Sequence, residues 1–464
     1  MTDLVCISPV DGREYARRPL ATHAEIEKVA ARARKAQRSW AQAPLEERCA
    51  VMLRFLAAME TLNPEIVPEL AWQMGRPVRY DGELRSLAER VRGLVEIAPG
   101  ALAPELPESG DGIVRRVDRV PAGLVLVVAP WNYPFLTAAN TIVAALLAGN
   151  AVLLKPSAQT PLTGERFALA LDMAGLPPGL FTSLFLGHET VMQALGEALV
   201  DHATFTGSVA GGRAIEQAAS LARRGFPSLT LELGGKDPAY VRADADLEGA
   251  VESLVDGSFF NSGQSCCAVE RLYVHEAVWQ PFLDGIVEAA QLYRLGDPLD
   301  PETSLGPMAS AAGAAKVRSQ VADAVAAGAE AHVEPQLFRA DTGDNAYLMP
   351  QVLTCVDHDM RVMREETFGP VVGLIKVQGD EEAIELMNDS DLALTASVWT
   401  RDLEAAGRLA PRIAAGTLFA NRCDYLDPRL AWTGFKHSGR GASLGRWGFE
   451  SVTRPRSFHL RAAR

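Results

Sequence analysis

Residues 122–157 read AGLVLVVAPWNYPFLTAANTIVAALLAGNAVLLKPS, and this stretch decides the fold class. No charged residue occurs between Val120 and Leu154, which by hydropathy alone would suggest a membrane span. Prolines and asparagines interrupt the apolar run, however, and proline breaks a helix because it lacks a backbone donor. The pattern instead predicts a strand, a loop, an apolar helix and a second strand, as in a parallel sheet buried on both faces.

Strand and helix patterns alternate on the C-terminal side of this stretch. They continue to the apolar run PSLTLELGG at 227–235, and a second series begins after Cys267. Repeated βα units predict an α/β protein with a doubly wound parallel sheet, and ligands bind such sheets at the carboxyl ends of the strands.

The N-terminal side has a different pattern. Residues 22–42 predict a helix, with Thr22 and Glu25 in the capping-box arrangement. Residues 113–120, IVRRVDRV, alternate apolar and polar side chains like an exposed or edge strand. An arm of this kind often pairs with another subunit.

Composition narrows the class of protein. A chain of 464 residues predicts about two or three domains. The net charge of -13 argues against nucleic acid as a partner. The histidines show no metal-ligand spacing, so no metal site is predicted, and neither a secretory signal nor a membrane span is expected. Scattered cysteines without C-x-x-C spacing favour a reducing cytoplasm; they are Cys6, Cys49, Cys266, Cys267, Cys355 and Cys423.

Two short stretches could bind phosphate or ribose. Residues 205–212, FTGSVAGG, form a glycine-containing turn between a predicted strand and a predicted helix. Free N–H groups at a helix N-terminus attract phosphate, although a tight turn explains the glycines nearly as well. Lys155, at the end of the strand in LLKPS, could hold a ribose hydroxyl or could be an ordinary solvated lysine.

Glu232 and Asn132 are candidates for acid–base and oxyanion chemistry. Glu232 stands within the apolar run LTLELGG, where desolvation would raise its pKa toward that of a general base; a structural carboxylate held by backbone donors is the alternative. Asn132 lies between two prolines in APWNYP. Its amide could donate to an oxyanion or could cap a turn.

The two adjacent cysteines lie in SGQSCCA, a polar loop just before a predicted strand. Free cysteines are most often small buried hydrophobes, but a polar loop suits an accessible thiolate, the nucleophilic form. One thiol could therefore attack a carbonyl while the other packs. A cysteine-protease interpretation is disfavoured because no histidine lies in a companion motif.

The set of motifs and their order resemble the aldehyde dehydrogenase superfamily over nearly the whole chain. The resemblance implies that Cys266 is the nucleophile, that Cys267 is a packing neighbour and that Glu232 is the general base. Asn132 and the backbone N–H of Cys266 would form the oxyanion hole. The motifs are APWNYP, GNAVLLKPS, FTGS, LELGGKDP, GQSC, EETFGPV and GFKHSGRG.

The resemblance also implies a nicotinamide dinucleotide, NAD or NADP, as cofactor. Lys155 would hold the adenosine ribose, and Gly207 and Ser208 would flank the pyrophosphate. Glu366 and Phe368 would position the nicotinamide ribose and ring. The implied cofactor contacts are Lys155, Ser157, Gly207, Ser208, Gly212, Glu366, Phe368, Trp131 and Leu233.

Three positions depart from common family members. Thr141 and Ser443 stand where many relatives carry a lysine and a glutamate that have been given proton-relay roles. The sequence therefore lacks the usual groups of a proton path from Glu232 to solvent. Ala158 stands where strictly NAD-dependent relatives often carry a glutamate that grips the ribose diol. Without that carboxylate a ribose phosphate would not be repelled, and we expect NADP to be tolerated.

The expected activity is oxidation of a small-molecule aldehyde to its acid through a thioester on Cys266. A CoA-acylating dehydrogenase and a catalytically silent binding protein are the alternatives; Glu232 disfavours the former, and the intact motifs the latter. For a charged substrate tail, Arg422 and Asp424 are candidates, although we expect both to be surface residues. The expected substrate pocket consists of Thr137, Asn140, Cys423 and Tyr425.

The resemblance divides the chain into three parts and predicts a homodimer or homotetramer. The expected dinucleotide-binding domain comprises residues 1–101 and 122–234, and the catalytic domain comprises 235–453. The oligomerisation arm comprises residues 102–121 and 454–464, which include the IVRRVDRV stretch and the tail RPRSFHLR.

Overall fold

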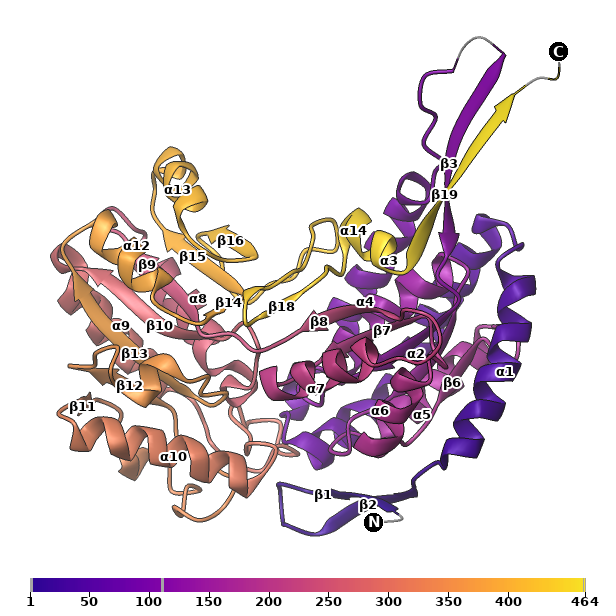
Figure 1. Ribbon diagram of the computed structural model, residues 1–464. Helices are drawn as coiled ribbons and strands as arrows, with labels where there is room; N and C mark the ends of the chain where they lie inside the picture. Colours follow the sequence, from indigo (N-terminus) through magenta and orange to yellow (C-terminus); the bar gives the residue numbers. More distant parts are fainter. Residues whose placement is uncertain (1–2, 110–111, 462, 464) are drawn as a thin grey trace.

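The computed structural model describes residues 3–109, 112–461 and 463, and its core consists of two mainly parallel sheets (Figure 1). The first sheet has six strands and includes both strands predicted within residues 122–157. One edge strand, β18, is antiparallel to its neighbour β8 and comes from the C-terminal part of the chain. In sheet order the strands are β18 (Gly439–Arg440), β8 (Ser228–Glu232), β7 (His202–Thr206), β4 (Leu124–Val128), β5 (Ala151–Lys155) and β6 (Phe181–Ser183).

Helices cover both faces of this sheet. Its central strands β4 and β5 are therefore buried along their whole length. The helix between them, α4, is mostly apolar and almost wholly buried, as the absence of charged residues from this stretch predicts. The helices of this half are α1 (His23–Trp40), α2 (Leu45–Met74), α3 (Leu84–Ala101), α4 (Pro134–Leu147), α5 (Leu162–Met173), α6 (His188–Gly196), α7 (Val209–Ser220) and α14 (Gly445–Ser451).

The second sheet has seven strands, of which only β11 runs antiparallel to its neighbour. In sheet order they are β11 (Glu330–Ala331), β12 (Gln351–Thr354), β13 (Val371–Val377), β10 (Val269–His275), β9 (Asp237–Val241), β15 (Thr395–Trp399) and β16 (Thr417–Ala420). Its helices are α8 (Leu247–Phe259), α9 (Trp279–Gln291), α10 (Ala311–Ala326), α11 (Arg361–Arg364), α12 (Asp380–Asn388) and α13 (Leu403–Leu409).

Three antiparallel pairs lie outside the two large sheets. One joins β3 (Ile113–Pro121) to β19 (Thr453–Arg461) and forms a ribbon that projects from the body (Figure 1). The edge strand predicted at 113–120 is therefore confirmed, and so is the capping box of Thr22 and Glu25. Residues 110–111, 462 and 464 of the predicted arm lie outside the described residues. The other pairs are β1 (Asp3–Ile7) with β2 (Glu14–Pro19), and β14 (Leu392–Ala393) with β17 (Phe435–Lys436).

The last part of the chain returns to the first sheet after completing the second. β18 pairs with β8, and α14 packs against α3 and α4 (Figure 1). Residues 439–452 therefore lie against the first half of the molecule, although they fall within the predicted catalytic segment. Among the described residues, no helix is both long enough and apolar enough to cross a membrane.

Candidate active site

The candidate site lies where the chain passes from the first sheet to the second. β8 ends at Glu232, and β9 begins only a few residues later at Asp237. The carboxyl ends of β4, β5, β7 and β8 line a cavity of about 610 Å³. The loop before β10 brings Cys266 into the same cavity. The nucleophile candidate is thus at the amino end of its own sheet, opposite to the usual position in parallel sheets.

Almost all of the residues expected to contact a cofactor line this cavity. Gly212 does not line the cavity. It packs against the side chain of Leu233, which does, and the neighbouring Gly211 lines the cavity instead. His188 and Met192 also line the cavity, and their positions in an ordinary helical pattern gave no signal; Phe205 lies in the predicted phosphate-binding stretch but was not itself predicted as a contact. The predicted residues that line the cavity are Trp131, Asn132, Lys155, Ser157, Gly207, Ser208, Glu232, Leu233, Cys266, Glu366 and Phe368.

The geometry of this cavity fits a dinucleotide. Gly207 and Gly211 both pack so tightly on Phe205 that a Cβ at either position would lie less than 3 Å from its ring, which leaves the backbone free to approach a phosphate closely. Ser208 caps α7 by accepting from the N–H of Gly211, and the remaining free N–H groups of the first turn favour an anion. The side chain of Lys155 is largely buried, and burial lowers its pKa.

A buried ion pair holds the loop that carries Asn132. Arg76 donates to Glu83 over 2.7 Å and to the backbone oxygen of Asn132 over 2.5 Å. The other carboxylate oxygen of Glu83 accepts from the N–H of Leu136 at 2.7 Å. Removing one partner of such a buried pair leaves an uncompensated charge. These contacts hold the backbone of the loop and so fix the position from which the Asn132 side-chain amide projects.

The loop that carries Cys266 is a strained turn tied to Asn132. Asn261, Ser262 and Gly263 all have positive φ, and a Cβ on Gly263 would collide with the backbone of residue 369. The side-chain amide of Asn132 donates to the backbone oxygen of Gln264 over 3.1 Å. This contact places the Asn132 amide beside the residues that immediately precede Cys266, where a carbonyl oxygen under attack would need a donor.

Glu232 is buried and only partly satisfied. Its Oε2 accepts from the hydroxyl of Thr206 over 3.3 Å, and its Oε1 has no partner among the described residues. Burial raises the pKa of Glu232, against the opposing influences of Thr206, Arg90 and the nearby hydroxyl of Ser443. The Ser443 hydroxyl makes no hydrogen bond of good geometry. A carboxylate with a raised pKa accepts a proton more readily than an ordinary glutamate does, as a general base must.

The two cysteines have different surroundings. Cys266 is partly exposed to the cavity, whereas Cys267 is buried and donates to the carboxylate of Asp424 over 2.9 Å. The contact with Cys266, burial and the charge of Asp424 raise the pKa of Cys267 well above its ordinary value. Cys267 is therefore a protonated, inert thiol at neutral pH.

A second buried pair positions the residues expected at the nicotinamide end. Lys236 pairs with Glu270, and Glu270 accepts from the backbone N–H groups of Thr367 and Phe368. Phe368 itself has positive φ and meets Trp131 edge to face at 5.5 Å between ring centroids. Glu366 accepts from the N–H of residue 235, and burial raises its pKa to about 7.

A smaller cavity of about 200 Å³ opens from the other side of Cys266 and Glu232. Of the residues expected there, Thr137 and Tyr425 line it. Asn140 does not, because it is buried behind Arg90 and accepts a hydrogen bond from its guanidinium. Cys423 also lies outside: it donates to the backbone of Ser253 and packs in the core of the second half.

Other lining residues of the smaller cavity were missed or expected elsewhere. Asp424, expected at the surface, turns inward with positive φ and lines the cavity. Arg422 is exposed, as expected. The residues that line the smaller cavity come from segments far apart in the sequence, so only the folded structure shows that they lie together. The missed lining residues include Glu89, Arg90, Tyr133, Asp256, Phe260, Ser265 and Trp432.

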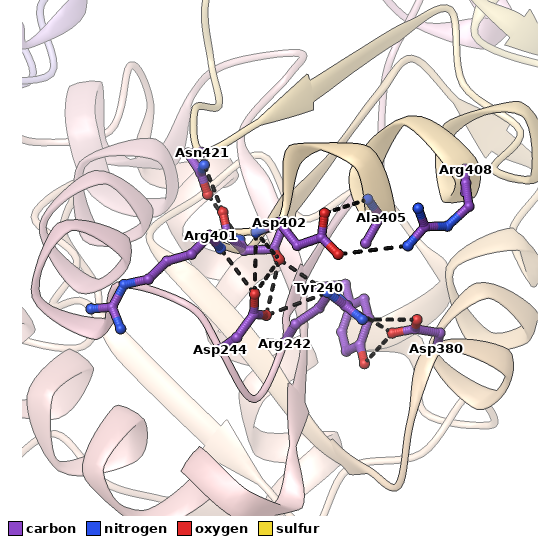
Figure 2. Close-up of polar contacts among 10 residues, drawn as sticks. Tyr240, Arg242, Asp244, Asp380, Arg401, Asp402, Ala405, Arg408 and Asn421 are labelled. Atoms are coloured by element: carbon purple, nitrogen blue, oxygen red, sulfur yellow. Dashed lines mark hydrogen bonds and ion pairs between the residues drawn. The ribbon is translucent and has the colours of Figure 1, made fainter.

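The loop that carries Asp424 is anchored by a polar network (Figure 2). Asn421, directly after β16, exchanges two hydrogen bonds with the backbone of Thr400, and the Thr400 hydroxyl donates to Asp244. Arg242 pairs with Asp380 in the same network. This network borders an open hollow of about 910 Å³ that shares no lining residue with the cavities around Cys266. Its charged groups largely satisfy one another, so we assign it a structural role.

Comparison with known proteins agrees with this geometry. The aldehyde dehydrogenase family model matches residues 2–458. A betaine aldehyde dehydrogenase of Cereibacter sphaeroides is 35% identical over 463 residues, which cover 98% of this chain and 93% of the relative.

Two similar structures contain bound dinucleotides. The structure described as PnpE in complex with nicotinamide adenine dinucleotide has a TM-score of 0.92 at 30% identity, covering 99% of this chain and 94% of that one. The structure of 3,6-anhydro-L-galactose dehydrogenase in complex with NAP has a TM-score of 0.91 at 29% identity, covering 99% and 96%.

The chain belongs to the aldehyde dehydrogenase family. Its activity is the oxidation of an aldehyde with NAD or NADP as cofactor. The predicted fold class, family, activity and cofactors are thereby confirmed.

Proposed function

We propose that the protein oxidises an aldehyde to the carboxylic acid by covalent catalysis on Cys266. The Cys266 thiolate attacks the aldehyde carbon, and the Asn132 amide with the backbone N–H of Cys266 stabilises the oxyanion that forms. The bound dinucleotide supplies the acceptor for the hydride that the substrate carbon loses. A thioester on Cys266 remains.

Glu232 then completes the reaction. Its carboxylate removes a proton from a water molecule, which attacks the thioester and releases the acid. Thr206 and Arg90 hold and stabilise this carboxylate, and Ser443 lies beside it. Ser443 stands at the position of the usual relay glutamate, and we infer that these three groups support the ionised form of Glu232 between turnovers.

One observation carries this proposal: Cys266 and Glu232 line both cavities. Of the described residues that line these two cavities, only Cys266 and Glu232 are shared, so the nucleophile and the base stand where a small molecule in the narrow cavity would meet a dinucleotide in the wide one. A hydride can be transferred only between groups in contact, so the junction of the cavities suits this chemistry.

The test is NAD(P)H formation with a panel of aldehydes by wild type and by Cys266→Ala. We expect the substitution to lower kcat by at least about 10³-fold, because no other group can form the thioester. Cys267→Ser is the matched control: it removes the neighbouring thiol, keeps a donor for Asp424, and should retain activity within about tenfold. Equal loss in both variants would contradict the assignment of the nucleophile.

The acid, rather than an acyl-CoA, is the proposed product. A buried base beside the thioester supports hydrolysis, since transfer to CoA needs no such group. Product analysis with and without CoA separates the two outcomes: acid should form without CoA, and a strict requirement for CoA would overturn this part of the proposal. A lack of activity in wild type with every aldehyde would favour a silent binding protein.

We also infer a cytoplasmic location, a homo-oligomer and the three-part domain division predicted above. The six cysteines of the chain are all free, which supports a reducing compartment. The projecting ribbon of β3 and β19 supports assembly, because a lone two-stranded ribbon is only marginally stable in water.

A further inference from the structure

The smaller cavity carries negative charge that the proposed reaction does not use. Its charged lining residues are the carboxylates of Glu89, Glu232, Asp256 and Asp424 and the guanidinium of Arg90. Glu232 is the proposed base. Burial lowers the pKa of Arg90 to about 10, and the charges of Glu232 and Glu89 oppose that shift. Four carboxyl groups therefore face a single cation, and Asp256 and Asp424 are not among the groups that influence that cation.

Asp424 lies directly beside the nucleophile loop. Its Oδ1 accepts from the hydroxyl of Ser265 and the thiol of Cys267, each over 2.9 Å. Burial raises its pKa to about 6, the two hydrogen bonds oppose that shift, and the charge of Asp256 adds to it. No cation of the described chain influences this carboxylate. It is mostly ionised at neutral pH, and a charge in such a place is stable only with a partner.

Asp256, on α8, is the second acidic group of this cavity; the residue as a whole is exposed, although it lines the cavity. Burial raises its pKa, and the only charged neighbour that influences it among the described residues is another acid, Glu252, one helical turn earlier. Glu252 does not line the cavity, whereas Asp256 does. The charge of Asp256 raises the pKa of Asp424, and no cation of the described chain is among the groups that influence either aspartate.

The remaining walls suit the alkyl part of a cation. Four aromatic side chains line the cavity, and aromatic faces attract ammonium groups. Arg422, which is exposed and does not line the cavity, already stacks on the ring of Tyr425 with its Cζ 3.4 Å from the centroid. Glu232 adds a carboxylate oxygen that is buried without a partner. The aromatic residues are Tyr133, Phe260, Tyr425 and Trp432.

We propose that the preferred substrate is a small aldehyde with a cationic tail, an ammonium or alkylated ammonium group held by Asp256 and Asp424. This inference rests on the proposed function, since the carbonyl must reach Cys266. An anionic tail is disfavoured because the guanidinium of Arg90 already donates to Asn140 and to the backbone of Leu426. The volume of about 200 Å³ leaves room only for a short chain and a compact head group.

The experiment compares two aldehydes of the same shape that differ only in charge, 4-(trimethylammonio)butanal and 5,5-dimethylhexanal. For wild type we expect kcat/KM to be at least about tenfold higher with the charged aldehyde. Asp256→Asn and Asp424→Asn should each reduce this ratio by about tenfold. Glu252→Gln is the matched control, because it removes the same charge from the same helix outside the cavity, and its ratio should stay within about twofold of wild type.

Asp424→Asn could disturb the loop that its side chain supports, whereas the Asp256 side chain supports no loop. A loss of charge preference in Asp256→Asn would therefore not come from a folding defect. Calorimetric binding of the corresponding alcohols gives a readout that needs no turnover, and the charged alcohol should bind at least about tenfold more tightly. Equal kcat/KM for both aldehydes would overturn this inference and leave the proposed function standing. No oxidation of either aldehyde, together with preferential binding of the charged alcohol, would overturn the proposed function and support the charge preference.

Discussion

Glu232 is the residue whose protonation state should control the second half of the reaction. Burial raises its pKa, so the carboxyl group keeps its proton to a higher pH than an ordinary glutamate and cannot accept one from water below that pH. We expect kcat to rise with pH through this raised pKa, as measured by initial rates under saturating substrate. Hydride transfer does not use this group and should not show the same dependence in a single turnover.

Replacement of Glu232 by glutamine should separate the two half-reactions. We expect Glu232→Gln to retain a rapid burst of NAD(P)H and to lower the steady-state rate by about 10²- to 10⁴-fold, because only thioester hydrolysis needs the base. Stopped-flow absorbance measures both phases. A proportionate loss of burst and steady state would argue that Glu232 acts before the thioester forms.

Ala158 is the residue at which cofactor preference can be tested. It is exposed directly after Ser157, which lines the wide cavity. We expect wild type to use NADP, and Ala158→Glu to lower kcat/KM for NADP at least about tenfold relative to NAD, because a carboxylate repels the ribose phosphate. Ala158→Gln controls for size and should change the ratio little. Turnover with NADP several orders of magnitude below that with NAD in wild type would contradict the expectation.

At the scale of elements, the packing of α7 on β8 shapes the wide cavity. A Cβ on Gly212 of α7 would lie 2.7 Å from the side chain of Leu233, which lines that cavity. We expect Gly212→Ala to push this leucine inward and to weaken NAD(P)H binding by about tenfold, measured by fluorescence titration. Gly407→Ala is the control, since its Cβ would meet nothing within 4 Å. Unchanged affinity in Gly212→Ala would show that Leu233 can move elsewhere.

The elements also explain how far sequence reasoning reaches. Strand-end turns could be predicted because glycine, proline and a single polar residue mark them, and the structure brings Asn132, Glu232 and Cys266 together in one cavity. The full length of α2 is not evident from local sequence, because the helix continues to Met74 through two prolines, Pro64 and Pro68. Helical packing around this segment outweighs the local preference of proline.

The narrow cavity could not be predicted in the same way. Arg90 and Asp256 come from α3 and α8, and a helical pattern does not state which neighbour a polar side chain will face. Asp424 lies in a loop with positive φ that is anchored through Asn421 (Figure 2), and Ser265 and Cys267 donate to its carboxylate. Substrate preference therefore depends on tertiary contacts between segments far apart in the sequence.

At the scale of the whole molecule, the ribbon of β3 and β19 is the element for which contacts within a single chain give no structural reason. It projects from the body (Figure 1), and its strands have long exposed edges. Val114 and Leu460 face each other across the ribbon and are 55% and 58% exposed. Unpaired strand edges and apolar pairs of this kind favour association with another chain. We therefore expect a mass at least twice the 49.8 kDa of the chain.

The ribbon itself provides the variant and the matched control for this expectation. Val114→Lys with Leu460→Lys places two charges on the apolar face and should dissociate the assembly to a monomer at micromolar concentration, since neither charge could be buried against a partner chain without a large cost. Arg115→Lys with His459→Lys changes the adjacent cross-strand pair on the opposite, already polar face and should leave the mass unchanged. Light scattering after size-exclusion chromatography measures both. A monomeric wild type would refute assembly through any surface, whereas an intact oligomer in the first variant would place the interface away from this ribbon.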